Sequence, residues 1–213
     1  MRKLCACALA LTLLNGSALA EITIDPATAT LEELIEARDR IDAEIDARRI
    51  AEAASFASGS YVVGEDMPAG SYVIYPDESS RVSSIAVRAL VKDEEQLVAF
   101  ESVRVQAVVE VSDGQTLELT NATAMPLEFS DAVDLSAEDV CNGGYLVGVH
   151  LPAGTYRLAP VKDALLPSYS VQNAPTGRTA SILAFAVIHE SVEITLEEGN
   201  YIQLTNCVLT AAS

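Results

Sequence analysis

The sequence predicts a mainly β protein, in which two tandem small antiparallel β-sandwich or jelly-roll-like repeats follow one amphipathic helix. Three observations predict this fold. A 14-residue phrase occurs twice, both copies are rich in alternating Val, Ile and Thr, and a segment without Gly or Pro precedes them with helical apolar spacing. With 213 residues, half of them hydrophobic, the chain is long enough to bury a core.

The first element, residues 1–20, has the pattern of an export signal. Arg2 and Lys3 precede an apolar run at 4–14, and small residues lead up to Ala20. The run is too short to cross a bilayer core of about 30 Å, which needs about 20 apolar residues. We therefore expect cleavage after Ala20 and an exported protein, periplasmic or extracellular, without a membrane anchor.

The net charge of the chain limits the classes of partner that are expected. Lys and Arg number 13 against 31 Asp and Glu, a formal charge of -18. Removal of residues 1–20 leaves 11 basic residues against the same 31 acids, or -20. Nucleic acids and anionic lipid head groups attract basic proteins, so neither is expected as a partner.

The next element is a helix predicted over 31–54, which residues 21–30 lead into. Thr30 is placed as its N-cap, with Glu33 completing a capping box. A narrow apolar stripe runs through residues at helical spacing: Leu31, Leu34, Ile41 and Ile45. At 1.5 Å per residue the helix would be about 36 Å long.

Two uses of this stripe remain open. It can dock on the following domain, or it can meet copies of itself in a short coiled coil and make a homo-oligomer. Arg38 and Arg48 fall on the heptad seam, and only about three heptads are available, which weakens the coiled coil. Glu36 and Arg40 are expected to form an ion pair on a solvated face.

The remainder of the chain contains an internal repeat of one sequence unit. Residues 59–72 and 143–156 match at 8 of 14 positions with an offset of 84, and a second match pairs 114–121 with 199–206 at an offset of 85. Two anchors at nearly one offset indicate a duplication. The predicted domains are residues 21–56 for linker and helix, 57–126 for repeat 1, 127–140 for a linker, and 141–213 for repeat 2.

Within the first copy the alternation predicts strands at 61–63, 72–75, 83–91, 96–101, 103–111 and 115–119. Tight turns are predicted at Asp113-Gly114, with Glu198-Gly199 as its counterpart, and at the Pro-Ala-Gly motifs. These motifs comprise Pro68, Ala69, Gly70, Pro152, Ala153 and Gly154. Residues 161–179 are expected to be irregular.

Cys141 and Cys207 are the cysteines left after signal cleavage. They flank copy two, and the corresponding positions of copy one are Ala57 and Ala122. Paired presence and paired absence predict a disulfide, which an oxidising compartment permits. Such a bond would close a loop of about 67 residues and stabilise the fold by about 4 kcal/mol before strain. The alternative is two buried free thiols.

The phrase Tyr-x-Val-Gly-x-x-x-Pro-Ala-Gly-x-Tyr starts at Tyr61 and again at Tyr145, and Gly-x-x-x-x-Leu-x-Asn starts at Gly114 and Gly199. Together these motifs resemble an uncharacterised family of small extracellular β-domains in bacterial secreted proteins. The resemblance covers most of the chain after the helix. It implies an all-β fold and an exterior location, and it implies no reaction.

The match to that family differs between the copies. Members end on Asn-Cys, which Asn206-Cys207 matches and Asn121-Ala122 does not.

Residues with catalytic or metal-binding chemistry are sparse. His150 and His189 are the two histidines, and both lie in strand-like contexts. Metal sites need clustered ligands, and calcium loops need a characteristic acidic spacing that the acidic runs lack, so no metal and no cofactor are expected. Nucleophile-elbow, dinucleotide-binding and Walker motifs are also missing from the sequence.

The recurring tyrosines are expected in the core or at turns rather than on a sugar-stacking platform: Tyr61, Tyr72, Tyr145 and Tyr156. The sequence thus favours a non-enzymatic structural or interaction module, self-associating through the helix, with its partner unknown. The alternative is an exported protein that binds a carbohydrate or peptide ligand.

Overall fold

The computed structural model describes residues 10–11, 22–23, 28–77, 79–92, 94–133, 135, 140–176 and 182–212. The predicted signal peptide lies outside these residues except for β1, Ala10–Leu11, which pairs with β2, Ile22–Thr23. The chain divides into two compact parts, Met1–Ala53 and Ala54–Ser213, and both β units described below belong to the second part. Among the described residues, no helix has the length and apolar character needed to cross a membrane.

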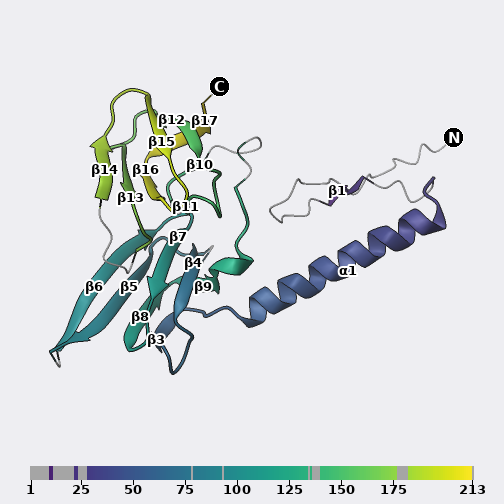
Figure 1. The fold of residues 1–213 in the computed structure, drawn as a ribbon, viewed down its shortest axis with the longest axis horizontal. Helices are drawn as coiled ribbons and strands as arrows, with labels where there is room; N and C mark the ends of the chain where they lie inside the picture. The colour runs from purple at the N-terminus through teal and green to yellow at the C-terminus, as the bar shows by residue number, and fades with distance from the viewer. Residues whose placement is uncertain are drawn as a thin grey trace. The chain divides into compact units, whose positions relative to one another are not determined.

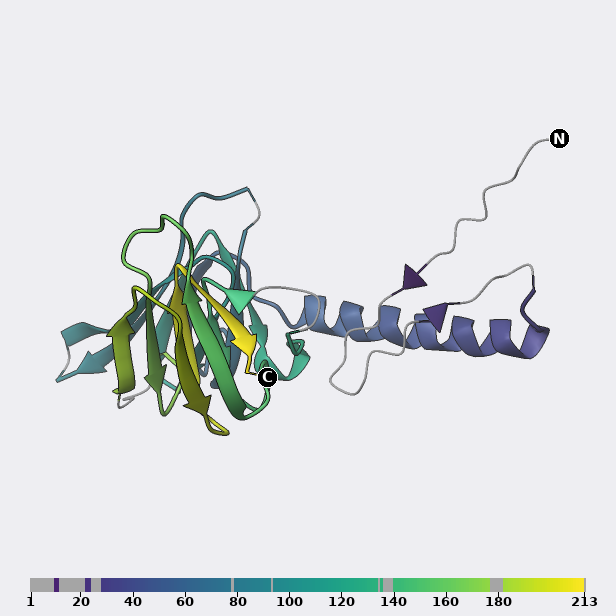
Figure 2. The ribbon, with the colours of Figure 1, turned by 90° about the horizontal axis from the view of Figure 1, so that it is seen from above.

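Helix α1 spans Leu31–Ala53, one residue shorter than predicted, and Figure 2 shows it as one continuous rod. The predicted capping box is confirmed. The Thr30 N–H donates to Glu33 Oε2 at 2.7 Å, and the Glu33 N–H donates back to Thr30 Oγ1 at 3.3 Å. These bonds satisfy amides at the start of the helix, and the hydrogen bonds that the Thr30 N–H and hydroxyl donate to the Glu33 carboxylate lower its pKa.

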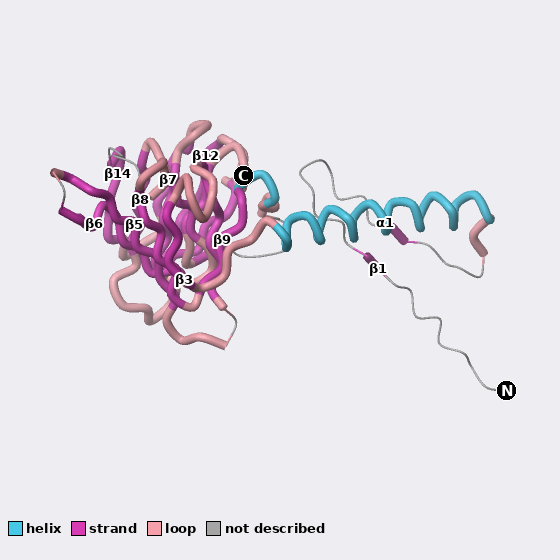
Figure 3. The backbone as a smooth tube through the Cα atoms, turned by 90° about the horizontal axis from the view of Figure 1, so that it is seen from below, coloured by secondary structure: helices cyan, strands magenta, loops and turns pink. Residues whose placement is uncertain are grey.

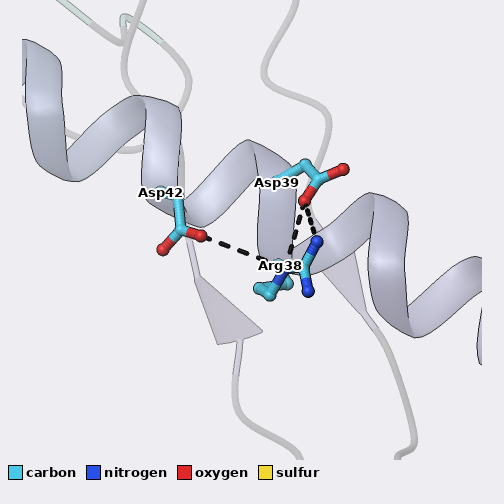
Figure 4. A network of polar contacts seen from close by, with 3 residues as sticks. All are labelled: Arg38, Asp39 and Asp42. Atoms are coloured by element: carbon cyan, nitrogen blue, oxygen red, sulfur yellow. Dashed lines mark hydrogen bonds and ion pairs between the residues drawn. The ribbon is translucent and has the colours of Figure 1, made fainter.

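The surface of α1 carries ion pairs at helical spacing. Arg40 Nη2 lies 2.5 Å from Glu36 Oε1, as predicted. Arg38 lies 2.6 Å from Asp39 Oδ1 and 4.0 Å from Asp42 Oδ2 (Figure 4). All five side chains are more than half exposed, so solvent screens these pairs and they add little to stability.

Residues 56–126 form a sandwich of two antiparallel sheets (Figure 1). Its strands are β3 Gly59–Val62, β4 Gly70–Pro76, β5 Ser83–Val91, β6 Glu94–Val103, β7 Ala107–Val111, β8 Gln115–Thr120 and β9 Ala122–Pro126. The sheet orders are β3-β8-β5-β6 and β7-β4-β9. A short 3₁₀ helix, Leu127–Phe129, follows β9.

Residues 140–211 repeat this sandwich. Its strands are β10 Val140–Cys141, β11 Gly144–Leu146, β12 Gly154–Pro160, β13 Ser168–Gln172, β14 Ile182–Val187, β15 Val192–Leu196, β16 Tyr201–Thr205 and β17 Cys207–Ala211. The orders are β11-β16-β13-β14 and β10-β17-β12-β15. A bridge between Phe56 and Ala124 takes the place of the β10–β17 pair in the first copy. The mainly β class and the two similar halves are confirmed.

The registers match as well as the orders. Tyr72 pairs with Val109 in the first copy, and Tyr156 pairs with Ile194 in the second, at offsets of 84 and 85. Ser168 is still 84 residues after its counterpart in β5, whereas β14 is 85 residues after β6. The extra residue of copy two therefore lies in the connection between β13 and β14.

Three strand predictions need correction. β9 was not predicted, because the last strand predicted for the first copy ends at Leu119. Asn121, with a φ of 49°, turns the chain directly from β8 into β9 of the other sheet. β13 lies inside the stretch 161–179 that was expected to be irregular. The strand predicted at 103–111 begins at Ala107 instead, since Val103 ends β6.

Each sandwich encloses its own core. Val87, Val109 and Leu117 bring both sheets of the first unit together, and Leu158, Ile202 and Leu209 do so in the second. The two clusters share no residue. The molecule thus has two cores rather than one merged sandwich, a question that the sequence left open.

Candidate functional site

The Pro-Ala-Gly motifs, Pro68-Ala69-Gly70 and Pro152-Ala153-Gly154, lie where each chain copy enters its central strand. Gly70 and Gly154 are the first residues of β4 and β12. Gly64 and Gly148, which precede the motifs, have left-handed φ values of 93° and 95°, and Gly70, the last motif residue of the first copy, has a φ of 156°. The motif therefore leads the chain into a strand, and the preceding glycine makes the turn.

Four recurring tyrosines tie these loops to the backbone. In each case the hydroxyl donates to the carbonyl four residues upstream. Tyr61 reaches Ala57 at 2.8 Å, Tyr72 reaches Pro68 at 2.7 Å, Tyr145 reaches Cys141 at 3.0 Å and Tyr156 reaches Pro152 at 2.5 Å. Their rings pack on the two cores, as predicted: Tyr72, Tyr145 and Tyr156 are buried, and Tyr61 is half-buried.

His150 occupies the position in the second copy that Asp66 occupies in the first, and it accepts the equivalent hydrogen bond. Asp66 Oδ2 accepts the N–H of Val62 at 2.8 Å, and His150 Nδ1 accepts the N–H of Leu146 at 3.0 Å. The imidazole is fully buried, and burial lowers its pKa to about 4. His150 is therefore neutral at pH 7 and holds a loop closed.

The predicted disulfide between Cys141 and Cys207 is wrong, because both thiols are free. Cys141 pairs with Val208 across β10 and β17. Directly opposed residues share a face of a sheet and neighbouring residues take opposite faces, so the two thiols point to opposite sides. Cys207 lies in the core, where burial raises its pKa, and its Sγ is 3.4 Å from the Ser168 carbonyl oxygen.

Metal-binding groups do not gather in the described part of the chain. No three His, Cys, Asp or Glu side chains there converge on a point that could hold an ion. His189 follows β14 and is exposed, whereas His150 is buried. Of the acids weighed as calcium ligands, Asp93, Asp134, Glu138 and Asp139 lie outside the described residues.

The second unit is fastened to the edge of β7 in the first unit. Gly144 N–H donates to the Gln106 carbonyl at 2.8 Å, and Gln106 Nε2 donates to the Gly144 carbonyl at 3.3 Å. Thr176 takes part in two more backbone bonds, donating to the Val108 carbonyl at 3.2 Å and accepting from the Glu110 N–H at 2.8 Å. β7 is an edge strand, and this pairing covers it.

A partly buried carboxyl lies at the same junction. Glu101, on β6, accepts hydrogen bonds from Tyr201 Oη at 3.1 Å and from Thr176 Oγ1. Tyr201 Oη in turn accepts the N–H of Val108 at 3.3 Å. Burial raises the pKa of Glu101, although the hydrogen bonds from Thr176, Gln203 and Tyr201 lower it.

The junction is built from positions at which the copies differ. A Cβ on Gly144 would lie 1.8 Å from Tyr201 Oη, so only glycine lets that hydroxyl reach the first unit. The junction residues and their counterparts in the other copy are Glu101 and Ala186, Gly144 and Ser60, and Tyr201 and Thr116. Divergence after duplication therefore gave the two units complementary faces.

A group of exposed apolar side chains lies on each of two equivalent edge strands of the β units. β6 and β14 each end a sheet, and Figures 1 and 3 place both along the same side of the β units. Six side chains on them are between 45% and 66% exposed: Leu97, Val98, Phe100, Ile182, Leu183 and Phe185. We call the first three the β6 patch and the last three the β14 patch.

Both patches are built by the same irregularity. In β6, Ala99 pairs with Val87 and Leu97 with Arg88, so Val98 is the extra residue of a bulge. In β14, Ala184 pairs with Val171 and Ile182 with Gln172, which makes Leu183 the counterpart of Val98. Ala99 and Ala184 pack on the cores, so their large neighbours Phe100 and Phe185 are turned outward.

Comparisons of the chain with protein-family models, curated proteins and solved structures gave no match.

Sequence reasoning missed both patches, although part of the signal was present. The pair Ala99-Phe100 recurs as Ala184-Phe185, and it served only as evidence for duplication. An aromatic that recurs beside a small core residue at a sheet edge is the pattern that would have pointed to the surface.

Proposed function

We propose that this chain is an exported, non-enzymatic interaction module. One observation carries the proposal: two equivalent edge strands each hold three large apolar side chains at a bulge, exposed by 45–66%. Such groups on a sheet edge are a liability in a protein without partners, and their presence in both copies supports a binding role.

The use of the polar groups supports a non-enzymatic role. His150 accepts a backbone N–H, the recurring tyrosines hold loops, and Glu101 joins the two units. Each group is engaged in a bond that maintains the fold. Export rests on the pattern of residues 1–20, and a mature protein beginning at Glu21 in N-terminal sequencing is the expected result.

Self-association through α1 is the finer part of the proposal. Leu31, Ile35, Ile45 and Ile50 are all exposed on this helix. Pairing of two helices would cover such side chains, and the chain would then present its β units as a homo-oligomer.

The test of self-association is the molar mass in solution by light scattering or sedimentation equilibrium. Protein starting at residue 21 should show a multiple of the monomer mass, and protein starting at residue 55 should be monomeric. Ile45→Glu in the longer chain should also give a monomer, whereas Asp46→Glu, at an exposed neighbour, should leave the mass unchanged. A monomer in every case would remove the helix from the proposal.

The second candidate is a protein that binds a peptide ligand. β6 and β14 each end a sheet, which favours it, because edge strands accept extended segments. A carbohydrate ligand has less support, since the recurring tyrosines pack on the cores.

A further inference from the structure

The β6 patch and the β14 patch share one chemistry. Each combines a phenylalanine, an aliphatic residue at the bulge and a further aliphatic residue before it. Burying one such set against a partner removes three large apolar side chains from water, which favours binding.

Acidic side chains outnumber basic ones around the patches, although Arg88, which is ion-paired with Glu118, lies opposite Leu97, and Lys92 and Arg104 flank β6. Neither β6 nor β14 contains Lys or Arg. Glu94 and Glu95 are exposed at the start of β6, and Glu190 and Glu193 are exposed just after β14. The chain as a whole has a formal charge of -18. A partner that brings Lys or Arg beside its apolar side chains is therefore attracted at long range and paired at the rim.

A second copy of the chain fits these edges poorly. Two copies repel each other through the same acidic charge. Both edges also carry an extra residue in mid-strand, which interrupts regular pairing of one such edge with another. Charge and backbone irregularity both favour a different polypeptide as the occupant.

From these observations we propose that each patch binds an apolar polypeptide segment that carries Lys or Arg beside its apolar side chains, so that one chain holds two such segments. This inference rests on the proposed interaction function and names its partner chemistry. It does not depend on self-association through α1, because the patches lie on the β units.

The test uses a fluorescein-labelled peptide of alternating leucine and lysine as the probe, with a leucine–glutamate peptide as the charge control. Titration calorimetry and fluorescence anisotropy against the full mature chain give stoichiometry and affinity. We expect two lysine peptides per chain, weaker binding at 0.5 M salt, and no binding of the glutamate peptide.

Phe100→Ser and Phe185→Ser test the patches without changing charge. Each single variant should bind one peptide per chain, and the double variant should bind at least tenfold more weakly. The matched control is Val82→Ser with Leu165→Ser, which removes one exposed apolar side chain from a loop of each unit. This control should bind as wild type does.

Equal losses in the patch and control variants would overturn the proposal, because binding would then follow general charge or exposed apolar area. So would undiminished binding in the double variant. Assembly of the wild-type chain that Phe100→Ser and Phe185→Ser abolish, without peptide binding, would assign the patches to a second copy instead. That result contradicts this inference and leaves the interaction function standing.

Discussion

His150 shows how one side chain adapts to a position that its repeat partner fills with a carboxylate. Both Asp66 and His150 accept an N–H from the residue four positions upstream. Asp66 is exposed and tolerates its charge, whereas His150 is fully buried and is stable there only as the neutral imidazole. A buried neutral histidine makes folding sensitive to acid.

This burial predicts a loss of stability between pH 6.5 and 4. In that window the unfolded imidazole takes up a proton, while the folded one, with a pKa of about 4, does not. The unfolded state binds more protons, so the free energy of unfolding falls as the pH drops, by about 3 kcal/mol in all. Below pH 4 both forms are protonated and the loss stops.

His150→Asn keeps an acceptor for the Leu146 N–H but does not titrate. Urea unfolding from pH 4 to 7 should therefore show a flatter profile for this variant than for wild type. His189→Asn, at the exposed histidine, is the control and should keep the wild-type loss. A variant profile as steep as that of wild type would contradict the role given to His150.

At the scale of elements, the sequence predicted the segments with a strong local pattern. Strand β5 was predicted at its observed bounds and α1 within one residue, since alternation and helical spacing are local properties. β13 was missed because Pro167 and Pro175 flank a short segment of polar outward residues. β9 was missed because a single left-handed residue, Asn121, replaces the usual turn signal.

The cysteines mark a different limit. The duplication rightly brought the two ends of copy two together, because β10 pairs with β17. Whether two cysteines on neighbouring strands can bond depends on the register, and one residue of shift changes the face of the sheet. Spacing in the sequence does not give that register, so the disulfide prediction failed.

The fit between β11, β16 and β7 predicts a large effect from one methyl group. Gly144→Ala places a Cβ 1.8 Å from Tyr201 Oη, and Tyr201 is fully buried, so a strand must shift. We expect a loss of about 1–3 kcal/mol in the free energy of unfolding. Gly154→Ala is the matched control, because its nearest atom, Tyr156 Cε2, is 3.9 Å away. Similar losses from both changes would contradict this fit.

At the scale of the whole molecule, Glu101 links the stability of the junction to pH. Burial raises its pKa above the ordinary value of 4.5. The folded state then holds its proton more tightly than the unfolded state, so the contribution of Glu101 to stability is full in acid and is lost as the pH rises through the folded pKa.

Two substitutions separate the charge of Glu101 from its hydrogen bonds. Glu101→Gln should remove this pH dependence, seen as the difference from wild type in urea unfolding between pH 4 and 8. Glu101→Ala should destabilise the protein by about 1–3 kcal/mol, because the Tyr201 and Thr176 hydroxyls lose their acceptor. Glu94→Ala, on the exposed start of β6, should do neither. A wild-type pH profile for Glu101→Gln would contradict this role.

The groups that form this junction are not repeated on the equivalent edge of the second β unit. β15 of the second unit is the counterpart of β7, and its outward positions are Glu193 and Thr195. Suppose that a further copy of the first unit docked on β15 as the second unit docks on β7. The docking copy would then carry Glu118 at the position of Gln203, and the second unit would offer Ala186 at the position of Glu101. The charge and polar groups that fasten the two units are therefore not reproduced at the next edge.

Amide hydrogen exchange tests the central claim, that two duplicated sandwiches are fastened through the edge of β7. The amides of Val108 and Glu110 donate to Tyr201 and Thr176 of the second unit, whereas Glu193 and Thr195 occupy the equivalent places on β15, whose described pairing is with β12 alone. We predict slow exchange at Val108 and Glu110 and exchange at least a hundredfold faster at Glu193 and Thr195. Equal rates at the two pairs of amides would contradict the account.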